Sequence, residues 1–68
     1  MPNKVVIRRN IYQGIEAVSA SGQANMYSVA DVTLACIQLG YKETAQWIDE
    51  NWEQYIKGAF QGFEVTDN

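Results

Sequence analysis

The sequence has 68 residues, no histidine, one cysteine and a formal net charge of −3 at pH 7. A chain of this length forms one domain, and neither a disulfide nor a zinc site can reinforce its core, because the cysteine has no partner within the chain. The charge disfavours non-specific binding to nucleic acid, since neutralising phosphates supplies most of that affinity.

The first predicted helix covers residues 1–22 and has a basic start. Four β-branched residues recur at spacings of four, four and three, which places them on one helix face: Ile7, Ile11, Ile15 and Val18. Gly22 is suited to the left-handed conformation that commonly follows the end of a helix. The β-branched run at residues 5–7 is also typical of an extended segment, so a short arm in place of the first helical turns is an alternative.

The second predicted helix covers residues 27–40 and has the clearest end signals in the sequence. Ser28 is a good N-cap residue, and the acidic Asp31 in the first turn complements the helix dipole. Gly40 is placed to end the helix. An apolar stripe is expected to face the core, and it comprises Val29, Val32, Cys36 and Leu39, with Ala35 beside it.

The third predicted helix covers residues 41–58, and residues 59–68 form a tail. One side of the helix is apolar and carries Ala45, Ile48, Trp52, Tyr55 and Ile56. Most of the charged residues lie on the other side, and Trp47 falls at the margin between the two. Gly58 and Gly62 make the tail a poor helix. We therefore expect the tail to be irregular or to form a short strand, either folded back on the core or placed on a partner.

Together these elements predict an all-α fold, a small three-helix domain spanning residues 1–68. The second and third helices are expected to form an antiparallel hairpin around residues 40–41, because a short connection joins antiparallel neighbours. Two tryptophans, two phenylalanines and four tyrosines are a large apolar load for so short a chain. We therefore expect a homo-oligomer, specifically a dimer, to bury part of that load.

Residues 21–56 carry a longer pattern: a small residue and Gly, two variable residues, Asn-Met-aromatic, a capped helix, Leu-Gly-aromatic, and a helix with acidic pairs and a late Tyr. The positions that carry it are Ser21, Gly22, Asn25, Met26, Tyr27, Val29, Val32, Leu39, Gly40, Tyr41, Glu43, Trp47, Ile48, Glu50, Asn51 and Tyr55. This pattern resembles a family of short proteins of unknown function from bacteriophages and prophages, mainly of Gram-positive bacteria. The resemblance implies a viral or mobile-element origin and no particular activity. Trp52 and the Gly/Phe tail depart from the pattern.

Catalytic chemistry has little support in the sequence. No histidine is present for general acid–base catalysis. Cys36 lies on the apolar stripe of the second helix, where a cysteine behaves as a small buried hydrophobe rather than a nucleophile. Asp49, Glu50 and Glu53 are spread over more than one helix face, and no loop supplies further oxygen ligands for a cation. We therefore expect a non-enzymatic protein with no cofactor and no metal.

An alternative function is a small DNA-binding transcriptional regulator, because helix, glycine-containing turn and helix is the outline of a helix-turn-helix. The basic start, with Arg8 and Arg9, would then contact phosphates. Against this, the third helix has two basic and four acidic residues between positions 42 and 57, and no arginine that would read guanine. Ala35 and Gly40 are also five positions apart, where a tight turn of this type has four.

The function that the sequence favours is binding to another protein. Tryptophan is a frequent interface anchor, and Trp47 lies among acidic residues that would suit a basic surface. We predict an interaction site at Trp47, Glu50 and Glu53, supported by Glu43 and Asp49. The family resemblance makes the partner a host protein, which the chain would modulate or inhibit. An anti-defence or anti-CRISPR type inhibitor is one concrete version, because such effectors have basic channels.

No targeting signal and no run of transmembrane length is recognisable in the sequence. A single cysteine is compatible with a reducing compartment. We therefore expect a cytoplasmic protein without a membrane partner, located in the host cytoplasm if the chain is encoded by a phage.

Overall fold

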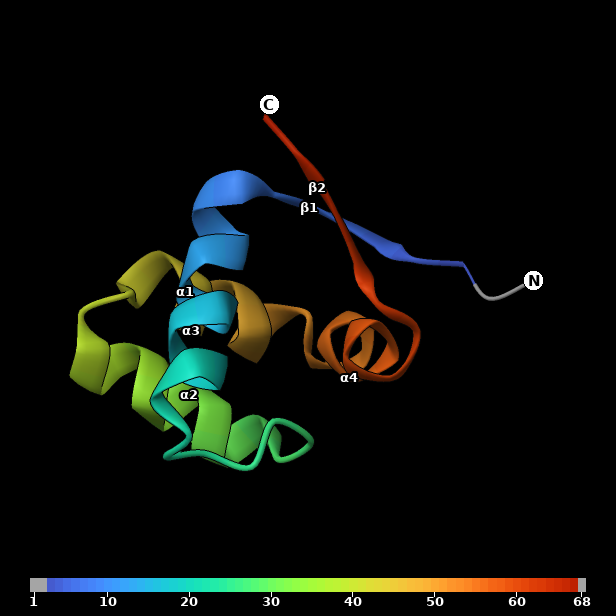
Figure 1. The fold of residues 1–68 in the computed structure, drawn as a ribbon. Helices are drawn as coiled ribbons and strands as arrows, with labels where there is room; N and C mark the ends of the chain where they lie inside the picture. The colour runs from blue at the N-terminus through green and yellow to red at the C-terminus, as the bar shows by residue number, and fades with distance from the viewer. Residues whose placement is uncertain (1–2, 68) are drawn as a thin grey trace.

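The computed structural model describes residues 3–67, and the predictions for residues 1, 2 and 68 lie outside this range. The elements in chain order are β1 (Val5–Arg8), α1 (Arg9–Ser21), α2 (Val29–Leu39), α3 (Lys42–Glu50), α4 (Trp52–Gln61) and β2 (Phe63–Thr66) (Figure 1). The described part of the chain is mostly helical. It departs from the predicted all-α three-helix domain in two ways, with four helices and a two-stranded parallel sheet.

The first helix begins later than predicted, because the chain at β1 is extended. Val5 and Ile7 are buried, whereas Val6 between them is 60% exposed, which is the two-residue alternation of a strand. β-Branched residues favour this conformation. The extended alternative for residues 5–7 is therefore the one that forms, and α1 follows at Arg9.

The predicted tail forms a strand within the chain rather than on a partner. β2 pairs with β1 in parallel, with Val5 opposite Phe63 and Arg8 opposite Thr66. Parallel strands need a long crossover connection, and here all four helices lie between them (Figure 1). Gly62 has a φ of 101°, which favours glycine, and it turns the chain from α4 into β2.

α4 runs to Gln61, beyond the predicted helix end at residue 58. The reason is that Gly58 lies directly against the ring of Phe63, and a Cβ at position 58 would collide with that ring. Glycine therefore permits close packing of β2 on α4, which offsets its low helix propensity.

The third predicted helix is two helices, because the chain turns at Asn51. The backbone there has φ −131° and ψ 41°, outside the helical region. Asparagine is a poor helix former whose side chain competes for backbone groups, and its amide nitrogen donates a hydrogen bond to the carbonyl of Trp47 at 3.0 Å. The turn re-aims α4 so that Tyr55 is fully buried, and it leaves Trp52, predicted on the apolar side, 54% exposed.

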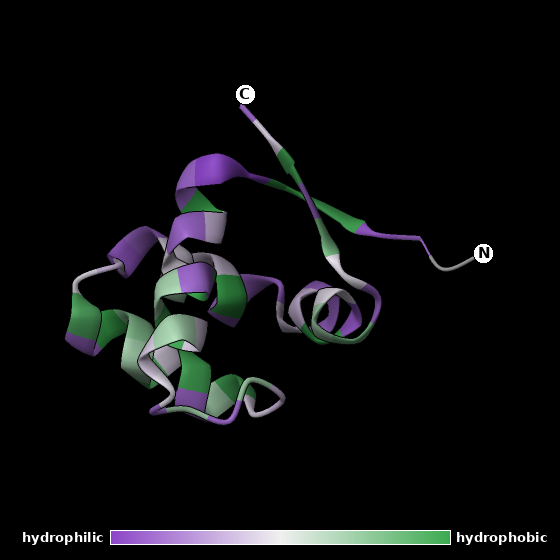
Figure 2. Ribbon diagram, in the orientation of Figure 1, coloured by the Kyte–Doolittle hydropathy of each residue, from purple (hydrophilic) through white to green (hydrophobic). Residues whose placement is uncertain are grey.

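α2 ends where its sequence signals predict. The Ser28 hydroxyl accepts a hydrogen bond from the Asp31 backbone N–H at 3.3 Å, and Gly40 has a φ of 91°. The two-residue connection at residues 40–41 joins α2 to α3 in the predicted hairpin. Leu39 was expected on the buried stripe but is 44% exposed, because it is the last helical residue before the chain turns back. Figure 2 shows α2 as hydrophobic along most of its length.

The core lies between α1 and the α2–α3 hairpin and continues to α4. Its fully buried side chains are Val18, Val32, Cys36, Thr44, Ile48 and Tyr55. α1 approaches α3 closely at Gly14, where a Cβ would collide with the Thr44 side chain. The Thr44 hydroxyl donates to the Ile11 carbonyl at 2.9 Å, which satisfies a buried polar group. None of the helices within residues 3–67 is long and apolar enough to cross a membrane.

Candidate functional site

Three of the five predicted site residues lie together on one side of α3. Glu43, Trp47 and Glu50 line an open hollow of about 240 Å³, which we call the Trp47 hollow. Their spacing of four and three residues places them on one helix face. The remaining lining residues are Arg8, Ile11 and Gln46. β1 and the start of α1 therefore form the wall opposite α3.

The indole of Trp47 is half-buried and packs against the hydrophobic core. Its side-chain N–H has no hydrogen-bond partner among residues 3–67. No buried side-chain nitrogen or oxygen in that range lacks a partner, so this N–H must be accessible to solvent. Trp47 therefore combines a ring held by packing with an available donor, which is the arrangement of an interface anchor.

The two carboxylates of the hollow have neutral partners. Glu43 accepts a hydrogen bond from the Asn10 side-chain amide at 2.8 Å, and Glu50 accepts one from Gln46 at 3.4 Å. Within residues 3–67 the one ion pair joins Arg9 to Asp67. The negative charges of Glu43 and Glu50 are therefore not neutralised by an ion pair, although Arg8 lines the same hollow.

The other two predicted site residues lie elsewhere. Asp49 lines a different hollow, between α2 and α3. Glu53 is on α4, beyond the turn at Asn51, and does not line the Trp47 hollow. The prediction included Glu53 because it assumed one straight helix, and the signal that could have separated Glu53 is Asn51, which disfavours a helix interior. Asp49 is on α3 itself, but its spacing of two residues from Trp47 places it on another face of that helix.

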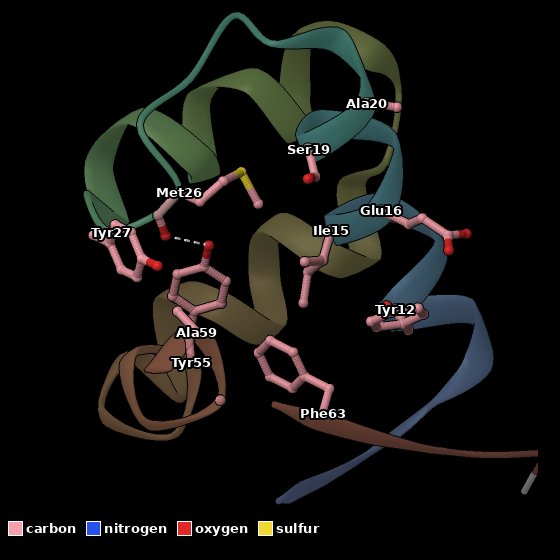
Figure 3. A pocket seen from close by; sticks show the side chains of 11 residues that line it. Tyr12, Ile15, Glu16, Ser19, Ala20, Met26, Tyr27, Tyr55, Ala59 and Phe63 are labelled. Carbon is pink, nitrogen blue, oxygen red and sulfur yellow. Dashed lines mark hydrogen bonds between the residues drawn. The ribbon is translucent and has the colours of Figure 1, made fainter. Parts of the chain in front are cut away.

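A larger groove was missed in the sequence analysis. It has a volume of about 520 Å³ and lies between α1, the segment before α2, α4 and β2 (Figure 3). Its lining residues are Tyr12, Ile15, Glu16, Ser19, Ala20, Met26, Tyr27, Tyr55, Gly58, Ala59 and Phe63. The rings of Tyr12 and Tyr55 lie 6.2 and 6.0 Å from that of Phe63. Local periodicity could not reveal the groove, because its walls come from opposite ends of the sequence.

The groove has a mixed lining of apolar and polar groups, and Glu16 is its one side chain that is charged at neutral pH. The Tyr55 hydroxyl donates to the Met26 carbonyl at 2.6 Å, across the space between α4 and the segment before α2 (Figure 3). Burial raises the pKa of Tyr55 to about 12, with smaller contributions from Cys36 and Tyr27. Tyr55 is therefore a neutral hydrogen-bond donor that ties two walls together rather than a proton-transfer group at neutral pH.

Several residues of the longer sequence pattern have structural roles. Gly22 has a φ of 67° at the end of α1. The Asn25 side chain accepts a hydrogen bond from the Tyr27 backbone N–H at 3.0 Å, which shapes the turn into α2. Asn51 and Tyr55 make the two side-chain bonds already described. Much of the pattern therefore specifies turns and packing, whereas Glu43, Trp47 and Glu50 also form a surface feature.

Cys36 is fully buried on α2, and burial raises the pKa of its thiol. A thiol in that environment is a poor nucleophile, since the reactive form is the thiolate. Among the residues that the structure describes, no group of three or more cysteine, aspartate or glutamate side chains is arranged to hold a metal ion.

The comparisons with known proteins give a family without an assigned function. A family profile described as "Domain of unknown function (DUF5049)" matches residues 7–62, and the chain belongs to this family. No curated protein and no solved structure matches the chain. The matched residues include α1, α2, α3 and α4 in full.

Proposed function

For this member of the DUF5049 family, we propose a non-enzymatic function in which the Trp47 hollow binds a basic segment of another protein. The observation that carries the proposal is the pair of carboxylates, Glu43 and Glu50, that have no ion-pair partner among residues 3–67 and line the same hollow as an accessible indole. Opposite charge across an interface speeds association and selects the partner. The segment that binds therefore carries lysine or arginine.

A long cationic side chain fits the chemistry of the hollow. Its charged end would meet Glu43 and Glu50, while its apolar stem would pack against Trp47. Both parts of the interaction are favourable, because a cation is also attracted to the face of an indole. α3 is already held by Thr44 and Ile48, which are fully buried, so the hollow needs little ordering when it binds.

Arg8 sets a limit on this interaction. It lines the Trp47 hollow from the side of β1 and carries the same charge as the proposed ligand. A bound cation would therefore approach the carboxylates on α3 and avoid the Arg8 side. Arg8 weakens binding in this arrangement. Replacing Arg8 with a neutral residue should therefore raise the affinity for a basic ligand, whereas replacing Glu43 or Glu50 should lower it.

The proposal extends to the setting in which the chain acts. The resemblance of residues 21–56 to phage and prophage proteins supports a host protein as the partner and a modulator or inhibitor role. An anti-defence protein that occludes a basic nucleic-acid channel is a concrete example, since an acid-lined surface complements such a channel. The proposed location is the host cytoplasm.

A helix-turn-helix regulator has less support. α3 would be the recognition helix, yet its exposed carboxylates Glu43 and Glu50 would face phosphates of like charge. Arg9 at the basic start is paired with Asp67, which reduces the positive charge available to DNA. DNA binding is therefore retained as an outcome of the test rather than as a second proposal.

The experiment that tests the proposal does not require a known partner. Peptides that bind the folded Trp52→Phe chain are selected from a random library. Trp47 is the remaining tryptophan in this chain, so its fluorescence reports binding. Trp52 is exposed on α4, so its replacement leaves the core intact. We expect the selected peptides to be rich in lysine and arginine, to change Trp47 fluorescence and to bind less to the Glu43→Gln/Glu50→Gln variant.

Glu53→Gln is the matched control, because it removes an exposed carboxylate outside the Trp47 hollow. Selected peptides without basic enrichment, or peptides that bind the double variant as well as the original, would refute the proposal. Random duplex DNA is tested in parallel. Salt-sensitive binding to that DNA, combined with failure of the peptide selection, would favour the regulator.

A further inference from the structure

The groove of about 520 Å³ between α1, the segment before α2, α4 and β2 has two unlike walls. On one side α1 carries Tyr12, Glu16 and Ser19, whose spacing of four and three residues places them on one helix face. On the other side lie the rings of Tyr55 from α4 and Phe63 from β2, across the groove from Glu16 (Figure 3). The groove is therefore polar along α1 and aromatic opposite it.

The polar groups on the α1 wall have no partners within the part of the chain that the structure describes. The side chains of Tyr12, Glu16 and Ser19 make no hydrogen bond or ion pair among residues 3–67. None of the described residues that line the groove is a lysine or an arginine. Glu16 therefore gives this wall a negative charge that no lining residue balances, and the two hydroxyls beside it can accept hydrogen bonds from a ligand.

The aromatic wall is suited to an apolar body and is already formed. Tyr55 is fully buried and Phe63 is half-buried, and their ring centroids lie 6.0 Å apart, with the buried Ile15 also lining the groove. The bond from the Tyr55 hydroxyl to the Met26 carbonyl joins α4 to the segment before α2. Small-molecule sites are clefts of roughly 300–1,000 Å³ that are largely pre-formed and carry a few polar groups among apolar ones. The groove therefore has the size and the lining of a small-molecule site.

We propose that this groove binds a small organic cation, a molecule with one aromatic ring and a protonated amine on a short chain. The ring packs against Tyr55 and Phe63, where aromatic pairs are favourable. The ammonium group lies at the rim, donates to the Glu16 carboxylate and contacts the ring of Tyr12, which attracts a cation. Because Glu16 is exposed at the outer edge of the groove, the ammonium keeps part of its hydration and loses little on binding (Figure 3).

The charge of Glu16 selects the sign of the ligand. An anion with the same ring would meet a like charge at the rim, and a neutral molecule would gain neither the ion pair nor the attraction to Tyr12. The groove and the Trp47 hollow have no lining residue in common. Binding of a small cation in the groove therefore goes beyond the proposed function, and either can fail without the other.

The first test is a titration of the full chain with three probes that share a phenyl ring: phenethylammonium, neutral phenethyl alcohol and anionic phenylacetate. Backbone amide NMR shifts report both affinity and place. We expect phenethylammonium to shift signals of residues 12–20 and 55–63, and to bind roughly three- to thirtyfold more tightly than the alcohol. No shift up to about 10 mM phenethylammonium, or equal affinities for the three probes, would overturn the proposal. Shifts confined to residues 43–50 and the Trp47 indole would also overturn it, because they would place the cation in the Trp47 hollow.

Variants of the α1 wall provide a second test. Glu16→Gln should weaken phenethylammonium binding roughly two- to fivefold and leave phenethyl alcohol unchanged, while Glu53→Gln, an exposed acid outside the groove, should affect neither. Tyr12→Leu should reduce the preference for the ammonium over the alcohol, and Tyr12→Phe should keep it, because phenylalanine retains the ring face. The amide spectrum of each variant confirms that it is folded. An unchanged preference in both Glu16→Gln and Tyr12→Leu would show that the α1 wall does not hold the cation and would overturn the proposal.

Discussion

The side-chain amide of Asn51 donates a hydrogen bond to the carbonyl oxygen of Trp47, 3.0 Å away, at the end of α3. The backbone N–H of Asn51 bonds to the same oxygen at 2.8 Å. Two donors on one carbonyl fix the turn between α3 and α4 at this point. The turn keeps Glu50 in the Trp47 hollow and carries Glu53 away on α4, so it defines which acids act together.

The strand assignment at the start of the described chain predicts a large loss of stability at one residue and almost none at its neighbour. Ile7→Ala should lower the free energy of unfolding by about 2–5 kcal/mol, because the side chain is buried and its loss leaves a cavity. Val6→Ala is the control, and it should change stability by less than about 0.5 kcal/mol, because Val6 is exposed. Denaturant unfolding followed by circular dichroism measures both. Equal effects of the two changes would contradict the alternation in β1.

The contact between α1 and α3 predicts a dependence between two positions. Gly14→Ala should destabilise the chain by about 1–3 kcal/mol, because the added methyl group collides with Thr44. In a Thr44→Gly background the same change should cost much less, since the colliding atoms are gone. A double-mutant cycle of unfolding free energies measures this coupling. An equal cost of Gly14→Ala in both backgrounds would mean that the two helices are not in contact there.

Tyr55 predicts a loss of stability in alkaline solution. The folded chain has a raised pKa at Tyr55, about 12 against the ordinary 10.0, with burial as the main cause. The folded chain therefore binds the hydroxyl proton of Tyr55 more tightly than the unfolded chain does. The stability that this provides is complete below pH 10 and is lost as the pH rises toward 12.

The comparison with Tyr55→Phe isolates this effect. At neutral pH the variant should be less stable by about 1–2 kcal/mol, because the Met26 carbonyl loses its hydrogen-bond donor. Above pH 10 the stability of the original should fall faster than that of Tyr55→Phe, so the two curves converge. Parallel curves between pH 9 and pH 12 would show that Tyr55 ionises normally in the folded chain.

Local signals in the sequence were enough to predict the parts of the fold that depend on neighbouring residues. Ser28 and Gly40 place both ends of α2, and the short connection after Gly40 predicts the hairpin with α3. The pairing of Val5 with Phe63 could not be predicted, because the two residues are far apart in sequence and no local pattern links them. Asn51 carried a helix-breaking signal, but the amphipathic pattern on either side of it favoured one continuous helix.

The candidate site was predictable to the extent that it lies on one helix. Glu43, Trp47 and Glu50 share a face of α3 by spacing alone. The contribution of Arg8 could not be foreseen, because it reaches the hollow through the sheet that joins the two ends of the described chain. The aromatic groove at Phe63 depends on the same long-range pairing.

Arg8 provides a prediction of gained affinity. Arg8→Gln removes a positive charge from the rim of the Trp47 hollow and should strengthen binding of a selected basic peptide several-fold at low salt. Lys57→Gln is the control, because Lys57 is exposed on α4 and does not line the hollow. Titration of Trp47 fluorescence in the Trp52→Phe background measures both. A weaker interaction after Arg8→Gln would place Arg8 among the groups that hold the ligand and would reverse its proposed role.

The most direct test of the account is the affinity of one selected basic peptide for four chains: Trp52→Phe and the same chain with Glu43→Gln/Glu50→Gln, Glu53→Gln or Trp47→Phe. Calorimetry at two salt concentrations compares them, and circular dichroism confirms that each is folded. The account predicts that neutralising Glu43 and Glu50 weakens binding by on the order of tenfold at low salt and less at high salt, while Glu53→Gln leaves it unchanged. Trp47→Phe should weaken binding at both salt concentrations, because ring contact is not screened. Equal affinities for the original and the Glu43→Gln/Glu50→Gln chain at both salt concentrations would contradict the central claim that this hollow binds a basic partner.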